Sequence, residues 1–182
     1  LPLAAQFVAA GLGFLIITGA LGLVFACALA LPDPPAWTVA VLARGLPLHA
    51  AAGFGGWFTL TAMGVSYRLL SMFMLAPEVE RWIGRWALRL SVAGLFTAVA
   101  AGLLAPAARS VTAIAAAGGE ATAGLGFVLY FYDMIRLYRT RRRRVLELNS
   151  WAAAAALGFF AVGVAWFAVA SAAGRAADFI GP

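Results

Sequence analysis

Long apolar segments without charged side chains are the feature that most constrains how this chain can fold. The first runs from about Leu3 to Leu31 and ends at Pro32, whose ring cannot continue a helix. A helix needs about 20 apolar residues to cross the hydrocarbon core of a bilayer. Of the 182 residues, 64% are hydrophobic and only 11% are charged, too few charges to cover a water-soluble domain. The chain is therefore predicted to be an integral membrane protein.

Five apolar segments of this length fit into the sequence. We expect an all-α fold, a single polytopic membrane bundle over residues 1–182 with about five transmembrane helices. The expected spans cover residues 3–31, 46–75, 86–104, 111–132 and 151–173. Residues 78–89 combine charges with tryptophans, a pattern typical of an interfacial lead-in to the third span. Because the chain begins at Leu1 rather than at a methionine, we also expect further residues to precede it.

The distribution of arginine predicts the direction of the bundle. All thirteen basic residues are arginines, and they lie mainly in the gaps between apolar segments. Four occur from Arg68 to Arg89 and six from Arg136 to Arg144, whereas the opposite loops hold only Arg44 and Arg109. Loops rich in arginine remain in the cytoplasm. We therefore expect a multi-pass protein of the bacterial inner membrane, with a cytoplasmic amino end and a periplasmic carboxyl end.

Four consecutive arginines follow the fourth span, namely Arg141, Arg142, Arg143 and Arg144. We interpret them as determinants of topology and as contacts for anionic lipid headgroups, each worth about 1 kcal/mol near the membrane surface. A partner protein or a nucleic acid is the alternative. No nucleic-acid motif accompanies the block, so we expect no nucleic-acid partner.

His49, the only histidine, lies one turn into the second span on its outer side, where a histidine can ligate haem iron. Gly53, Gly56 and Met63 follow it at helical spacing. A helix face that is nearly free of side chains can receive a flat macrocycle, but it can equally pack against another helix. Both interpretations stay open. Because the sequence has no second histidine, a haem would need a methionine, another chain or residues that precede Leu1 for its second ligand.

Glu120 lies near the middle of the fourth span, where an ionisable side chain is costly and therefore a functional candidate. It could make a structural hydrogen bond to a neighbouring helix, or it could transfer protons or contact a cofactor. Asp133, three residues before Arg136, is expected to form an ion pair with it at the membrane interface. Tyr130, Tyr132 and Tyr138 are expected to form an interfacial belt.

The segment from Leu46 to Pro77 reads LPLHAAAGFGGWFTLTAMGVSYRLLSMFMLAP. It resembles a segment of membrane proteins related to haem-copper oxidase subunit I, and most closely that of NnrS-like proteins. In that family an outer histidine precedes a glycine-rich stretch and the pattern G-W-x-x-L-x-x-x-G-V-x-Y-x-L-x-P-M-F. The matching positions here are Gly56, Trp57, Leu60, Gly64, Val65, Tyr67, Leu69, Met72 and Phe73, with Ser71 where proline is expected.

The resemblance implies that His49 is a haem or metal ligand, and no other ligand carries over. The partner histidines of that superfamily have no counterpart here, so we do not expect copper. Members of the family commonly have about twelve spans, which makes five spans a reduced relative or a fragment.

Three functions follow from these observations. The first is a haem-associated redox or nitric-oxide-related subunit without independent catalytic activity. The second is a non-catalytic accessory subunit that packs against other chains of a respiratory or photosynthetic membrane complex. The third is a transporter with Glu120 as its coupling carboxylate. The sequence contains no HExxH motif and no phosphate-binding loop, which argues against hydrolysis or phosphoryl transfer.

Overall fold

The computed structural model describes residues 1–75, 82–104, 109–142 and 148–172, in which every regular element is a helix. The elements are α1 (Leu3–Ala30), α2 (Ala36–Ala50), the π-helix η1 (Ala51–Phe58), α3 (Thr59–Met74), α4 (Trp82–Leu104), α5 (Arg109–Arg139) and α6 (Leu148–Ala172). The predicted all-α fold is confirmed for these residues.

Three of the helices are long and apolar enough to cross a membrane, namely α1, α4 and the part of α5 from Val111 onward. On α6, the apolar stretch Trp151–Trp166 is shorter. The expected second span is divided among α2, η1 and α3, which have 15, 8 and 16 residues. The three long helices indicate a membrane protein and agree with three of the five expected spans.

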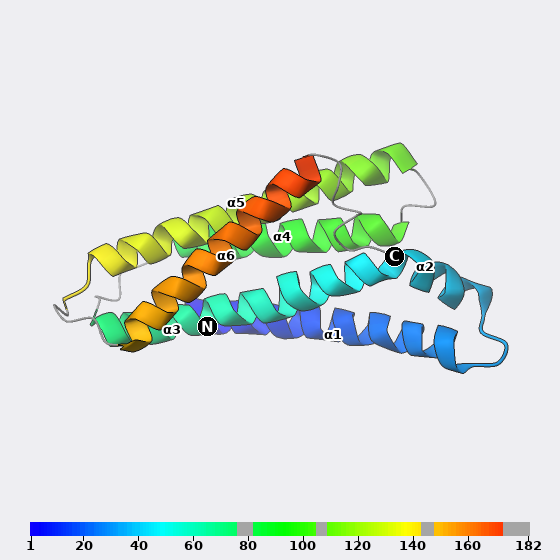
Figure 1. Cartoon of the computed structure of the whole chain (residues 1–182), viewed down its shortest axis with the longest axis horizontal. Coiled ribbons are helices and arrows are strands. Elements are labelled where there is room, and N and C mark those ends of the chain that lie inside the picture. Colours follow the sequence, from blue (N-terminus) through cyan, green and yellow to red (C-terminus); the bar gives the residue numbers. More distant parts are fainter. Residues whose placement is uncertain (76–81, 105–108, 143–147, 173–182) are drawn as a thin grey trace.

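When α2, η1 and α3 are taken as one continuous segment, each helical segment runs opposite to the one before it (Figure 1). The continuous helical segment α2–η1–α3 lies along α1, α5 lies along α4, and α6 crosses the bundle diagonally. As a result, the end of α3, the start of α4, the end of α5 and the start of α6 lie at the same end of the molecule. Residues 68–75, 82–89 and 136–142, which include most of the described arginines, therefore gather at that end; we call it the arginine end.

Two helix boundaries differ from the predicted ones. The second helix begins at Ala36, ten residues before the expected start, because Pro35 precedes its first turn and the Thr38 hydroxyl donates to the Pro35 carbonyl over 2.7 Å. Arg44 thus lies within a helix and not at its boundary. The second difference is the end of α5, which continues to Arg139, seven residues beyond the expected end at Tyr132.

Proline and glycine give the second helical segment its unusual middle. Pro47 lies inside α2 and has no N–H to donate to the preceding turn. The π-helix η1 begins four residues later and contains Gly53, Gly55 and Gly56. The wider turns continue to Phe58, and the Thr59 hydroxyl donates to the Phe54 carbonyl, five residues back, over 2.7 Å. The π-helix therefore begins two residues after His49.

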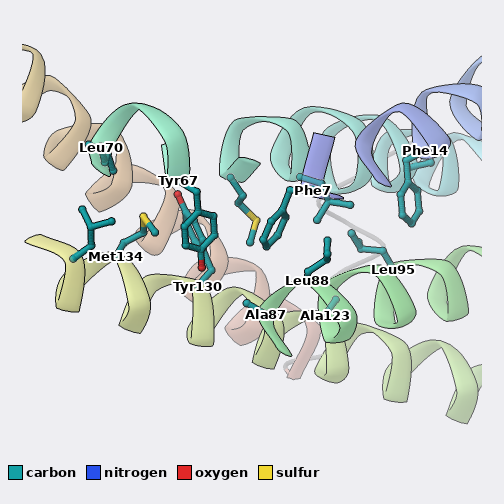
Figure 2. Close-up of a cluster of buried hydrophobic side chains, with 14 of the residues drawn as sticks. Phe7, Phe14, Tyr67, Leu70, Ala87, Leu88, Leu95, Ala123, Tyr130 and Met134 are labelled. Atoms are coloured by element: carbon teal, nitrogen blue, oxygen red, sulfur yellow. The ribbon is translucent and has the colours of Figure 1, made fainter. Parts of the chain in front are cut away.

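The core lies between the helix pairs (Figure 2). It is built from large side chains such as Phe7, Leu60 and Met63, each 1% exposed or less. Glycine lets α1 approach the second helical segment: a Cβ added to Gly64 would lie 2.7 Å from the Ala4 carbonyl oxygen, too close for any side chain. Backbone contact of this kind is how small residues hold transmembrane helices together.

The pairing of α4 with α5 uses the same device more extensively. A Cβ added to Gly119 would lie 2.6 Å from the backbone nitrogen of Ala98 and 2.7 Å from the Gly94 carbonyl oxygen. One turn or two further along, Ala123 is buried and Gly126 faces Ser91. The two helices therefore meet backbone to backbone along one face.

Adjacent glycines on α5 provide a test of this packing. Gly119→Ala should lower the free energy of unfolding by about 1–3 kcal/mol, because the added methyl group meets the backbone of α4. Gly118→Ala is the matched control, since a Cβ on Gly118 has nothing within 4 Å. Thermal unfolding of the purified chain in detergent, followed by circular dichroism, measures both. Equal midpoints for the two variants would show that the helices do not meet in this way.

Candidate functional site

His49 lies at the carboxyl end of α2 with its ring against α1. The imidazole and the Phe25 ring are tilted by 49° with centroids 5.4 Å apart. A Cβ added to Gly22 would lie 3.4 Å from the imidazole Cε1, in ordinary contact. The Nδ1 atom is buried and has no hydrogen-bond partner among the described residues. A ligating histidine usually donates its second ring N–H to a carboxylate or carbonyl, and no such acceptor is present here.

The other residues expected around a cofactor are covered by α1. The Phe14 ring packs directly against Gly56, and the Thr18 methyl group lies 3.4 Å from a Cβ placed on Gly53. Met63 is 1% exposed within the core. In this arrangement α1 lies against the glycine-rich segment that follows His49. The cofactor-binding role of Gly53, Gly56 and Met63 stays a prediction. The ligand role of His49 itself stays a prediction.

No three potential metal ligands of the His, Cys, Asp or Glu type lie together in the described residues. Glu120 is half-buried on α5, whereas His49 packs on α1.

The arginine block is described only in part. The Arg141 guanidinium stacks over the Tyr138 ring at 4.9 Å and donates to the Tyr138 carbonyl over 3.1 Å. Arg142 is exposed, and its backbone N–H donates to the Met74 carbonyl over 3.2 Å. This bond ties the end of α5 to the end of α3. Arg143 and Arg144 lie outside the described residues.

A buried polar cluster between α3 and α5 is the site that sequence reasoning missed. The Tyr67 hydroxyl donates to the Asp133 carboxylate over 3.0 Å, and the hydroxyls of Ser66 and Tyr130 are 2.6 Å apart. The rings of Tyr67 and Tyr130 meet edge to face at 5.6 Å, and Figure 2 shows them side by side. Tyr67, Tyr130 and Asp133 are each 5% exposed or less. We call these four residues the Tyr67–Asp133 cluster.

The cluster bears on two expectations. Asp133 is 4% exposed and accepts from Tyr67, a partner that was not expected, while the Arg136 guanidinium lies 6.0 Å from the Tyr132 ring. The ion pair between Asp133 and Arg136 stays a prediction. Tyr130 is 2% exposed, so it does not belong to an interfacial belt, whereas Tyr132 is 53% exposed and fits one. The available signal was helical spacing: Tyr130 and Asp133 are three residues apart and share one face of α5.

Comparisons of this chain with protein-family models, with curated proteins and with solved structures found no match.

Removing one hydroxyl tests the cluster. Tyr67→Phe should lower the free energy of unfolding by about 1–2 kcal/mol, because the buried Asp133 carboxylate loses a donor. Tyr132→Phe is the matched control, since that ring is exposed and its hydroxyl faces no described partner. Thermal midpoints in detergent compare the two variants. A loss in Tyr132→Phe as large as that in Tyr67→Phe would argue against a specific role for the buried bond.

Proposed function

We propose that this chain is a five-span protein of the bacterial inner membrane that works as a non-catalytic subunit of a larger membrane complex. The five-span part is supported by the alternating direction of the helices (Figure 1). The segment from Ala36 to Met74 is helical throughout, so it is long enough to cross once α2, η1 and α3 are taken together.

The orientation is supported by the arginine end. Arg68, Arg85, Arg89, Arg136 and Arg139 lie in the parts of α3, α4 and α5 that meet there. Arg44 lies towards the opposite end, on α2. Under the positive-inside bias, the arginine end faces the cytoplasm and the connection from α1 to α2 faces the periplasm.

Single cysteines can test this topology. In a Cys27→Ser background, Asp33→Cys places a thiol between α1 and α2, and Thr140→Cys places one directly after α5; both positions are exposed. A membrane-impermeant maleimide should label position 33 in intact cells, and position 140 only after permeabilisation. Labelling of both positions in intact cells would mean that α2–η1–α3 does not cross, and the reverse pattern would overturn the orientation.

The subunit role is carried by one observation: the helices present two populations of glycine. Gly64, Gly94, Gly119 and Gly126 bring helices into backbone contact, whereas a Cβ on Gly13, Gly19, Gly118, Gly124, Gly158 or Gly163 has nothing within 4 Å. Glycine destabilises a helix by about 1 kcal/mol relative to alanine. Contact with lipid does not offset this cost, whereas close packing against another helix does. Ala117, Gly118 and Ala121 form an exposed small-residue face on α5. A span of another chain, packed on that face, would give these residues the contact that the inner glycines already have.

The size of the extracted protein tests the subunit role. From native membranes in a mild detergent, the chain should migrate as a complex several times its own 18.9 kDa. Gly118→Leu should release it, because the new side chain blocks close approach. Val128→Leu, on the same exposed side of α5, should not. A single monodisperse chain at the lowest detergent concentration would sink the proposal.

Haem association at His49 is the second candidate. It is favoured by the π-helix that directly follows α2, because π-helical turns occur frequently at functional sites. Such a haem would lie on the side of His49 away from α1 and would take its second ligand from another chain. It predicts a Soret band in the purified complex that His49→Ala removes. A complex without absorbance in the haem region, after expression with ample haem, would exclude it.

A further inference from the structure

An apolar groove opens between α3, α5 and α6 at the arginine end, with a volume of about 360 Å³. Its floor is made by side chains that are 5% exposed or less, namely Leu70, Met74, Met134 and Leu137. Its outer wall is α6, which contributes Leu157 and Gly158. Dry apolar cavities of about 150 Å³ already bind benzene, so a groove of this size and lining suits a longer hydrocarbon.

The wall formed by α6 leaves the groove open. None of the described side chains from Trp151 to Trp166 is buried, although α6 runs along the bundle. A Cβ added to Gly158 would have nothing within 4 Å, so the space above this glycine is empty of protein atoms. The groove is therefore accessible from the side of the bundle, between α5 and α6.

The mouth of the groove is basic. Arg139 lines it and is exposed, and Tyr138 lines it beside the Arg141 guanidinium stacked on its ring. The Arg142 backbone N–H donates to the carbonyl of Met74, which also lines the groove. The apolar lining thus has the Arg139 guanidinium at its edge and the Arg141 guanidinium beside Tyr138, and no described acidic side chain lines the groove.

We propose that this groove is a binding site for one anionic phospholipid, with an acyl chain between α5 and α6 and the phosphate at Arg139 and Arg141. The apolar groove matches the acyl chain of such a lipid, and the arginines match its phosphate. They also follow each other along the bundle in the right order, because the arginines lie at the end where a membrane surface would be. Basic pockets between transmembrane helices on the cytoplasmic side are a general way to bind phosphate headgroups. The inference rests on the proposed membrane placement of the arginine end.

Native mass spectrometry of the full chain in detergent tests the site with two probes, dioleoyl phosphatidylglycerol and dioleoyl phosphatidylcholine. The wild-type chain should retain one phosphatidylglycerol after the detergent is removed, at a concentration where phosphatidylcholine is not retained. Gly158→Leu should weaken this binding at least tenfold, because the new side chain occupies the groove. Gly163→Leu is the matched control, since Gly163 is equally open, lies on α6 and does not line the groove.

The charge of the mouth is tested separately. Arg139→Gln should lower the preference for phosphatidylglycerol over phosphatidylcholine about fivefold, the equivalent of about 1 kcal/mol per arginine near an anionic lipid. Arg139 is exposed, so its replacement should not disturb the fold. Arg139→Gln therefore tests the lipid site even if circular dichroism shows that Gly158→Leu does not fold. Equal retention of both lipids, unchanged binding by Gly158→Leu in a folded chain, or an unchanged preference in Arg139→Gln would each overturn the site. The cysteine-labelling experiment tests the membrane topology independently of lipid binding. Loss of the lipid site would therefore leave the proposed function unaffected, and an error in the topology would be detected by the labelling alone.

Discussion

Close approach of helix backbones at glycine is the interaction on which the rest of this bundle depends. Within a bilayer, apolar side chains gain little by leaving lipid for another helix, so helices associate through short-range packing and a few polar bonds. Gly94 and Gly119 let α4 and α5 meet at backbone distance, and Gly64 does the same for α3 and α1. These contacts tolerate no added methyl group, which means that they fix both the separation and the axial register of each pair.

The polar cluster joins the two helix pairs that these glycines close. An ionisable side chain inside a bundle of transmembrane helices is costly unless it is paired or hydrogen-bonded. The Tyr67 hydroxyl reaches Asp133 only because α3 and α5 are held in one axial alignment, with the Tyr67 ring also against Phe7 of α1 at 5.4 Å. The glycines fix each pair, and this hydrogen bond, together with the contact between the Ser66 and Tyr130 hydroxyls, aligns the two pairs with each other.

Periodicity and composition were enough to predict an all-helical membrane bundle, and the ends of α1 and α4 lie close to their predicted positions because proline or aromatic residues mark them. The start of α2 could not be predicted this way, since Arg44 and Pro47 look like boundaries although both lie inside a helix. The glycine-rich segment after His49 showed that something approaches it closely. It did not show which group does so, because a glycine-rich helix face can receive either a cofactor or another helix. In the structure α1 packs against this face. The bond between Asp133 and Tyr67 was missed for a similar reason: spacing along one helix points to Arg136, whereas Tyr67 is 66 residues away in the sequence.

The unequal packing of the helices bears on function more than any single residue does. Two pairs are closed by backbone contact, whereas α6 meets the bundle through aromatic rings, with Phe160 against Phe127 and Phe131 at 5.7 and 5.2 Å. Rings at that distance attract each other weakly and do not fix a helix as backbone contact does. The glycines of α6, Gly158 and Gly163, remain without neighbours in the same region. A helix held in this way has faces left for contact with a lipid or with a span of another chain. Either can therefore pack against α6 without disturbing the register of α1, α2–η1–α3, α4 and α5.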